Sequence, residues 1–375
     1  MRSKPKVLFI QSTPATRLSS GYHVRGANSP VLEKLSRIYD IESFNWSKRQ
    51  EQTINPNKVY LLDGFQIFFN LLNCLLKGKF NAIVTTGIPV LESIPAFIIA
   101  KLLHIPIMIK ETHWYWPNTK VSKLTWPINK IMVSNCNLVI CPGKRAYEYW
   151  RLLGVPEKKI TIVPFYTSIL QVNPEINQLS LNIRSKFNDS IIVLYFGRFI
   201  RKKGIDYLVN AFAKIQKDFD NVVLLLAGDG PERNNLEALC SNFDLDAVAF
   251  AGAIDEQIKA AYFLAADIYV YPSVLLELPE EWPIGLVEAM SVGKPVVVTS
   301  AVGSAPDVVQ HGINGYVVQE KNSEALYLAL KKLIENENLR RNMGWISKEI
   351  VEKNYSYNKA AQSLDDAIKT VIART

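Results

Sequence analysis

The chain has 375 residues, of which 48% are hydrophobic and 21% are charged, and its formal net charge is +8. This composition is that of a soluble globular protein, and it excludes a low-complexity chain. The length indicates two domains, each large enough for its own hydrophobic core.

The positive charge lies in the first half. Residues 1–170 contain 22 Lys and Arg residues against 9 Asp and Glu residues, a net charge of +13. Residues 171–375 contain 21 against 26, a net charge of −5. The asymmetry favours contact between the first half and something anionic, such as a membrane surface, a lipid phosphate or a nucleic acid. A generally basic proteome explains it equally well.

No segment is predicted to be a signal peptide or to span a membrane. The apolar run Val7–Ile10 is too short for a signal peptide. Phe65–Leu76 and Ile88–Ile109 are interrupted by polar residues or prolines, whereas a spanning helix needs about 20 mostly apolar residues. We therefore expect a cytoplasmic protein. The scattered cysteines predict reduced thiols and no zinc site; they are Cys74, Cys136, Cys141 and Cys240.

Short apolar runs alternate with helical patterns along the whole chain. In the first half the predicted strands are Val7–Gln11, Ile41–Asn45, Ala82–Thr85, Ile107–Lys110, Leu138–Cys141 and Ile160–Val163. In the second half they are Ile191–Phe196, Val222–Ala227, Ala247–Phe250, Ile268–Tyr271, Val296–Thr299 and Tyr316–Val318. Strands rich in Val, Ile and Leu on both faces belong to buried parallel sheets, and βα alternation indicates doubly wound folds.

The two domains are predicted to meet at a linker over residues 171–188, where prolines and polar residues show no clean period. The first domain then covers residues 1–170 and the second covers residues 189–355. A helical pattern in the tail, residues 356–375, predicts a last helix. The pattern alone does not say which domain this helix packs against.

The end of the strand Ile191–Phe196 carries the first chemical signal. Gly197 and Arg198 follow this strand, and Lys203 precedes a predicted helix. Ligands of doubly wound sheets bind where strands end and helices begin. Glycine permits close approach and the cations neutralise charge, so the segment suits a diphosphate. A solvated basic run explains it equally well when it is taken alone.

The second signal is an acidic loop followed by a helix. Glu280 lies in the loop and Glu288 lies eight residues later in the helix, and a carboxylate can accept paired hydrogen bonds from ribose hydroxyls. The backbone N–H groups of Gly285, Leu286 and Val287 lie in the first helical turn and can point at a phosphate. The alternative is that the acidic residues only stabilise the helix N-terminus and that Glu288 lies on the surface.

A third segment, Gly228-Asp229-Gly230-Pro231, follows the strand Val222–Ala227. It lacks the third glycine of the dinucleotide-binding fingerprint. A tight turn into the next helix explains it without a ligand.

In this order, the segments resemble the large retaining glycosyltransferase family GT4, which has the two-domain GT-B fold. The resemblance rests on GRFIRKKG at 197–204, LLLAGDGPERNNLEAL at 224–239, VAFAGAI at 248–254 and the long segment at 266–318. It covers essentially the whole second half. The first half matches more loosely, through GVPEKKITIVP at 154–164.

The resemblance implies two facing doubly wound domains, with the terminal helix crossing back onto the first. It also implies roles for single residues. Arg198 and Lys203 would hold the donor pyrophosphate, Glu288 would bind the ribose, and Glu280 would lie against the donor sugar. The loop that starts at Gly252 would contact the base through backbone groups.

Two residues of the first half are carried over from the same resemblance. Gly21 is similar to the glycine of the N-terminal loop that faces the donor phosphate or the acceptor, although its partner here is Ser20. His113, just past the strand Ile107–Lys110, resembles the family histidine that faces the donor sugar. A structural or surface histidine is the alternative.

The resemblance further implies a retaining, metal-independent enzyme without a cofactor. Its donor would be a UDP- or GDP-sugar, and its acceptor a saccharide or a lipid-linked molecule. We expect no nucleic-acid partner, because no recognisable binding motif accompanies the basic residues. Contact with an anionic membrane surface remains a hypothesis. A sugar-nucleotide epimerase, a phosphorylase and a non-catalytic sugar-nucleotide-binding protein are the alternatives on this architecture.

Overall fold

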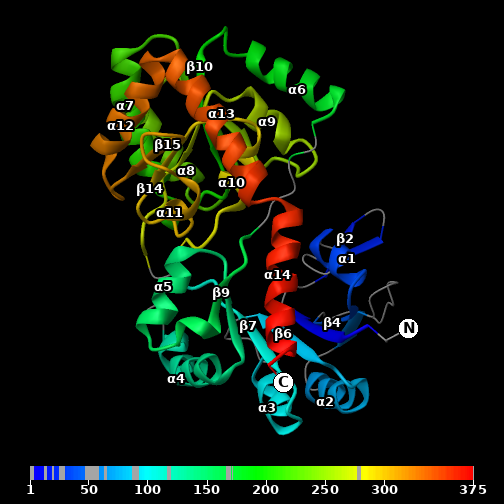
Figure 1. Cartoon of the computed structure of the whole chain (residues 1–375). Coiled ribbons are helices and arrows are strands. Elements are labelled where there is room, and N and C mark those ends of the chain that lie inside the picture. The colour runs from blue at the N-terminus through cyan, green and yellow to red at the C-terminus, as the bar shows by residue number, and fades with distance from the viewer. Residues whose placement is uncertain are drawn as a thin grey trace. The chain divides into compact units, whose positions relative to one another are not determined.

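The computed structural model describes residues 4–11, 15–18, 21–24, 30–46, 59–62, 66–86, 93–115, 120–165, 170, 172–276 and 280–374 (Figure 1). The chain divides into two compact units. Unit 1 comprises Met1–Phe165 together with Tyr357–Thr375, and unit 2 comprises Tyr166–Ser356. Each unit is built on its own parallel sheet.

Unit 1 contains a seven-stranded parallel sheet with the order β5-β4-β1-β6-β7-β8-β9. Its strands are β1 (Lys6–Gln11), β4 (Asp40–Trp46), β5 (Val59–Leu62), β6 (Ala82–Thr86), β7 (Ile107–Lys110), β8 (Leu138–Cys141) and β9 (Ile160–Ile162). A separate antiparallel pair is formed by β2 (Ala15–Leu18) and β3 (Gly21–Val24). The central strands are buried because helices cover the sheet, as parallel sheets require.

The helices of unit 1 alternate with its strands. They are α1 (Pro30–Ser36), α2 (Gln66–Gly78), α3 (Ser93–Leu102), α4 (Lys120–Asn135), α5 (Lys144–Leu152) and α14 (Tyr357–Ile372), with a 3₁₀ turn, η1, at Glu157–Lys159. A core of buried apolar side chains joins α2, α3, α4 and α5 to the sheet.

The last helix, α14, belongs to unit 1, although the chain reaches it from unit 2. It packs against α1 and β6 through a buried apolar face that includes Leu364 and Ile368. The buried Asp365 accepts hydrogen bonds from the hydroxyl of Tyr39 at 2.7 Å and from the ammonium of Lys369 at 2.7 Å. The helix that the resemblance implied to cross back to the first domain therefore does so.

Unit 2 contains a six-stranded parallel sheet with the order β12-β11-β10-β13-β14-β15. Its strands are β10 (Ile191–Phe196), β11 (Val222–Ala227), β12 (Val248–Gly252), β13 (Ile268–Tyr271), β14 (Val296–Thr299) and β15 (Gly315–Val318). The order reverses at β10, as in a doubly wound fold. The predicted fold class is confirmed.

Helices cover both faces of the unit 2 sheet, and two separate apolar cores lie between the helices and the sheet. The helices are α6 (Pro174–Ser185), α7 (Ile205–Asp218), α8 (Arg233–Asn242), α9 (Lys259–Ala265), α10 (Ile284–Ser291), α11 (Ala305–Val308), α12 (Ser323–Glu335) and α13 (Glu337–Asn354), with a 3₁₀ turn, η2, at Arg201–Lys203.

The segment predicted as a linker, residues 171–188, contains helix α6. Asn173 caps it by accepting a hydrogen bond from the backbone N–H of Ile176 at 2.8 Å, and Pro174 occupies the first helical turn. The helix packs against α9 in unit 2, where Arg184 forms an ion pair with Asp267 at 2.9 Å.

The contact between α14 and the rest of unit 1 generates a stability prediction. Tyr39→Phe removes the hydrogen bond to the buried carboxylate of Asp365, so we expect the free energy of unfolding to fall by about 1–3 kcal/mol. Chemical denaturation of the variant measures the change. Tyr207→Phe is the control, because the structure gives its hydroxyl no hydrogen-bond partner among the described residues. Equal effects of the two substitutions would contradict the prediction.

Candidate active site

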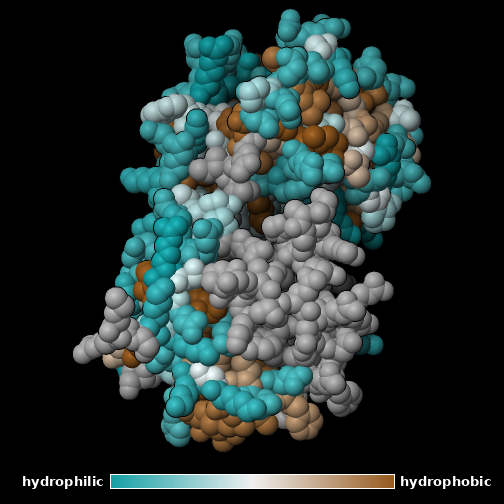
Figure 2. Space-filling view, turned by 90° about the vertical axis from the view of Figure 1, so that its right-hand side faces the viewer, coloured by the Kyte–Doolittle hydropathy of each residue, from teal (hydrophilic) through white to brown (hydrophobic). Residues whose placement is uncertain are grey.

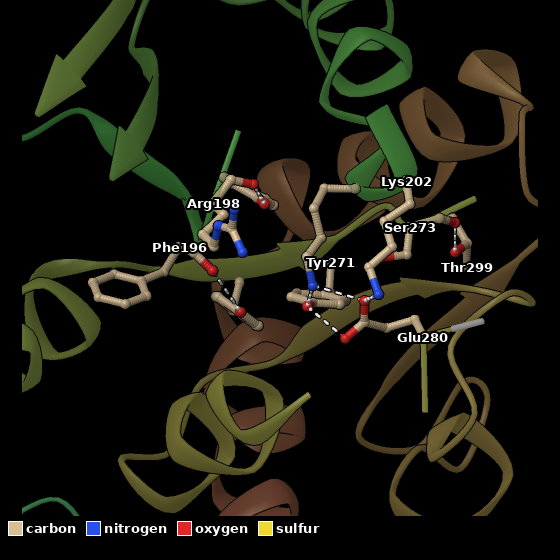
Figure 3. Close-up of polar contacts among 10 residues, drawn as sticks. Phe196, Arg198, Lys202, Tyr271, Ser273, Glu280 and Thr299 are labelled. Atoms are coloured by element: carbon tan, nitrogen blue, oxygen red, sulfur yellow. Dashed lines mark hydrogen bonds and ion pairs between the residues drawn. The ribbon is translucent and has the colours of Figure 1, made fainter. Parts of the chain in front are cut away.

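The carboxyl end of β10 presents a cation. Gly197 and Arg198 directly follow the strand, and Arg198 is exposed. Its backbone carbonyl accepts a hydrogen bond from the hydroxyl of Tyr195 at 3.0 Å, which fixes the loop against the sheet. Figure 3 shows Arg198 beside Tyr271, at the neighbouring end of β13. Two strand ends therefore meet at one edge, where doubly wound sheets bind ligands.

The turn at 228–230 supports this loop. The backbone N–H of Phe199 donates to the carbonyl of Asp229 at 2.9 Å. A Cβ atom on Gly228 would lie 1.9 Å from the carbonyl oxygen of Gly197, so only glycine fits. As predicted for this segment, packing explains the turn without a ligand.

Lys203, Tyr271 and Glu280 form a buried network. Figure 3 shows Tyr271 and Glu280 of this network in the same view as Arg198. The ammonium of Lys203 lies 2.7 Å from a carboxylate oxygen of Glu280 and also donates to the Tyr271 hydroxyl. The same hydroxyl donates to the other carboxylate oxygen of Glu280 at 3.1 Å. Lys202 adds a second ammonium 3.4 Å from that carboxylate. Glu280 therefore stands between two lysines from the β10–α7 loop.

Local backbone geometry places Lys203 in this network. The turn η2 ends at Gly204, whose φ of 60° lies in the left-handed region that favours glycine. A Cβ atom there would lie 2.3 Å from the carbonyl oxygen of Pro272, directly after β13. The close approach brings η2 against the end of β13, so Lys203 reaches Tyr271.

Burial sets the electrostatics of the network. Lys203 is only 9% exposed and Glu280 only 8%. Burial lowers the pKa of Lys203 and outweighs the opposing effect of the Glu280 carboxylate. Burial, followed by the negative charge of Glu280, raises the pKa of Tyr271 well above its ordinary value. Tyr271 therefore stays a neutral hydrogen-bond donor.

Glu288 lies in a second cluster at the same sheet edge. It is 3% exposed, and its carboxylate lies 2.5 Å from the ammonium of Lys259, which also pairs with Glu256. Burial alone would lower the pKa of Lys259, but the two carboxylates raise it overall. Tyr269 is within electrostatic reach of both clusters. Burial raises the pKa of its hydroxyl well above its ordinary value, and the charges of Glu288 and Glu280 raise it further.

The first turn of α10 lies close to Tyr269. A Cβ atom on Gly285 would lie 3.0 Å from the Tyr269 hydroxyl. Of the three amides predicted to face a phosphate, that of Leu286 donates to the carbonyl of Pro283 at 3.2 Å, and those of Gly285 and Val287 lie in the same turn.

Gly252 ends β12 at the same edge of the sheet, with a φ of 75°. Its carbonyl accepts a hydrogen bond from the backbone N–H of Gly228 at 2.8 Å. The predicted base-binding loop thus starts beside the turn that supports Arg198.

The two residues predicted in the first half lie in unit 1. His113 follows β7, and its Nδ1 atom lies 3.1 Å from the carboxylate of the fully buried Glu111. Gly21 is the first residue of β3. Both stand apart from the unit 2 network in the division of the chain.

Sequence reasoning missed three residues of the site, which are Lys202, Lys259 and Tyr271. Lys202 stood in the basic run but gave no sign of its carboxylate partner. Tyr271 and Lys259 carried no motif at all.

Within the described ranges, no group of three or more His, Cys, Asp or Glu side chains could hold a metal ion. No helix of these ranges is long and apolar enough to cross a bilayer.

Comparison with known proteins consistently returns glycosyltransferases. A sequence model described as glycosyl transferases group 1 matches residues 179–349. An uncharacterized glycosyltransferase of Methanocaldococcus jannaschii is 25% identical over 372 residues, which cover 91% of this chain and 93% of the relative.

Two solved structures share the fold. A glycosyltransferase from Rickettsia africae has a TM-score of 0.77 and 17% identity, over 99% of this chain and 100% of that chain. HepE of Anabaena, in complex with UDP, has a TM-score of 0.75 and 17% identity, and the match covers 97% of this chain and 100% of HepE. Two doubly wound units of this kind are the GT-B fold, which the chain shares with these structures. The sequence model and the relatives named as glycosyltransferases identify the chain as a glycosyltransferase. The group 1 model covers residues 179–349, which lie in unit 2.

The second cluster generates a prediction. Lys259→Met removes the ammonium group that pairs with the buried carboxylate of Glu288. We therefore expect the free energy of unfolding to fall by about 3–5 kcal/mol. Thermal or denaturant unfolding measures the loss. In the double variant Lys259→Met/Glu288→Gln the buried charge is also gone, so part of the stability returns. A double variant less stable than the single one would refute this account of the pair.

Proposed function

We propose that this glycosyltransferase transfers a sugar from a nucleoside-diphosphate sugar to a saccharide or lipid-linked acceptor, with retention of anomeric configuration and without a metal ion. One observation carries the proposal: Lys202 and Lys203 hold the carboxylate of Glu280 at the carboxyl edge of the unit 2 sheet, and Arg198 lies close enough to lower the pKa of Lys203. Three cations against one carboxylate leave a site that is complementary to an anion with two linked phosphates.

The cations act on the leaving group. When the bond between the anomeric carbon and the phosphate oxygen breaks, both electrons stay on the departing diphosphate. Positive groups fixed at that position stabilise the developing charge. The acceptor hydroxyl oxygen forms the new bond to the anomeric carbon, and its proton passes to an oxygen of the departing phosphate. Glu280 then positions the sugar and the lysines rather than attacking the sugar itself.

Metal independence follows from the same charges. The ammonium groups of Lys202 and Lys203 and the guanidinium of Arg198 supply the positive charge that a divalent ion would otherwise provide. Since Lys202 and Lys203 are held by the network around Tyr271 and Glu280, they need little rearrangement when the donor binds.

The donor nucleotide is assigned to the edge between β10 and β12. Glu288, beside Lys259, supplies a carboxylate for the ribose hydroxyls, and the loop after Gly252 supplies backbone groups for the base. The UDP complex of HepE supports a uridine nucleotide. GDP remains the second nucleotide to be tested.

A non-catalytic sugar-nucleotide-binding protein is the main alternative. It would need the cations but not Glu280. The presence of Glu280 beside the phosphate-binding cations favours turnover, because a protein that only binds the nucleotide sugar has no need of a carboxylate there.

Exposed apolar side chains on unit 1 support peripheral contact with an anionic membrane. They include Phe69 and Leu76 on α2, 70% and 56% exposed, and Ile98 and Leu102 on α3, 50% and 72% exposed. Figure 2 shows apolar surface at the bottom of the view, the level at which Figure 1 places α2 and α3. Exposed lysines on both helices, such as Lys77 and Lys101, suit anionic headgroups.

The diphosphate site gives a direct test. Arg198→Ala should abolish the thermal stabilisation by the matching nucleoside diphosphate and lower the transfer rate by about 10²–10³, by analogy with removal of an oxyanion donor. UDP- and GDP-sugars are screened by thermal shift, and product formation is followed with the stabilising donor, with and without EDTA. Lys217→Ala, an exposed lysine elsewhere on unit 2, is the matched control.

An Arg198→Ala variant that binds the nucleotide like the parent would show that the diphosphate lies elsewhere. A parent protein that binds the donor but never turns it over, with any saccharide or lipid-linked acceptor, would favour the non-catalytic alternative.

Membrane contact is tested by co-sedimentation with liposomes. We expect binding to rise with the content of anionic lipid and to fall with added salt, because the attraction of lysines to headgroups is screened. Leu102→Ser should weaken it by removing apolar contact, whereas Leu328→Ser, an exposed leucine of unit 2, should not. Liposome binding that does not change with the content of anionic lipid would contradict the proposed contact.

A further inference from the structure

Unit 1 contains a cavity of about 440 Å³ at the amino edge of its sheet. Asn137 directly precedes β8 and Lys159 directly precedes β9, and both line the cavity. Ligands of doubly wound sheets bind at the opposite, carboxyl edge. The cavity is therefore separate from the donor site, which belongs to unit 2.

Four cations from three parts of the chain line this cavity. Lys101 comes from the end of α3, Lys158 and Lys159 come from η1, and Arg374 follows α14. None of its described lining residues is acidic. Glu157, the nearest acid in sequence, lies 3.9 Å from the guanidinium of Arg151.

Backbone carbonyls, not carboxylates, hold two of these cations. The ammonium of Lys159 donates to the carbonyl of Ser134 at 3.4 Å. The guanidinium of Arg374 donates to the carbonyl of Lys158 at 3.3 Å. Neither contact neutralises the charge, so both cations remain available to an anion.

Two of the cations act electrostatically on the same group, the thiol of Cys136. Cys136 lines the cavity, and burial raises the pKa of its thiol to about 12. The ammonium groups of Lys159 and Lys101 both oppose that rise. These two cations therefore act on the same buried thiol in the cavity lining, while the carboxylate of Glu111 acts on it in the opposite sense.

The ends of three helices account for only part of this charge. α3, α4 and α14 end at the cavity, and each helix C-terminus carries about −0.5 of an elementary charge. Together they offset about 1.5 of the four positive charges. The cavity therefore keeps a net positive charge.

We propose that this cavity binds a phosphoryl group. The amide groups of Asn135 and Asn137 add neutral polar groups beside the cations, and Arg374 offers the guanidinium geometry that suits phosphate oxygens. Exposed apolar side chains flank the cavity: Leu102 next to Lys101, and Ile131 one turn before Asn135, 72% and 60% exposed. A lipid headgroup and a soluble phosphate monoester share this chemistry.

The test uses the full chain with Arg198→Ala, which weakens phosphate binding at the proposed donor site and leaves the buried pair of Lys203 and Glu280 intact. Glycerol 3-phosphate is titrated calorimetrically, and vesicles with or without phosphatidic acid are used for co-sedimentation. Lys158→Gln/Arg374→Gln removes two exposed cations of the cavity that the proposed membrane contact does not use. Lys217→Gln/Lys353→Gln removes two exposed lysines of unit 2 and keeps the same net charge.

We expect the cavity variant to bind at least about tenfold more weakly than the control, because charge-assisted hydrogen bonds are lost. Loss in the vesicle arm alone identifies a lipid headgroup, and loss in the soluble arm alone identifies a free monoester. Loss in both arms identifies the phosphoryl group itself. Equal binding by the two variants, or no binding by the parent in either arm, overturns the proposal.

Discussion

A buried ion pair at the carboxyl edge of one sheet is the constraint on which the site depends. Lys203 and Glu280 lie almost out of water, and neither charge is tolerable there without the other. Their contact requires η2 to press against the end of β13, which requires glycine at position 204. The Tyr271 hydroxyl completes the network. The loop that carries Arg198 is held by a different device, the packing of the 228–230 turn.

Much of the fold could be predicted because buried parallel strands leave a plain signal. All twelve predicted strands are present, and most of them are runs rich in Val, Ile and Leu bounded by turns. The strands that were missed lie at or outside the sheet margin: β5 is the edge strand of unit 1, and β2 and β3 form a separate pair. All three are only four residues long, and β2 and β3 mix polar with apolar residues. Helix α6 was missed because its cap and proline were taken for linker residues.

Only those site residues that lie in a sequence motif could be predicted. The unit 2 structure pairs Lys203 with Glu280 and places Arg198 within electrostatic reach of Lys203. Glu288 lies at the same edge but in its own cluster with Lys259. Their pairing joins two helices, α9 and α10, that meet only in the folded protein. Periodicity cannot reveal such a partner, since the two residues lie 29 positions apart.

The docking of α14 has a consequence for synthesis of the protein. Asp365 and Tyr39 are 326 residues apart, yet they share a buried hydrogen bond. Domains generally fold as the ribosome releases them, the first one earliest. The rest of unit 1 emerges first but lacks α14 until Tyr357–Ile372 has been translated, so the apolar surface that α14 covers stays uncovered until then. Unit 2 can finish folding in the meantime, and the order of maturation is the reverse of the order of emergence.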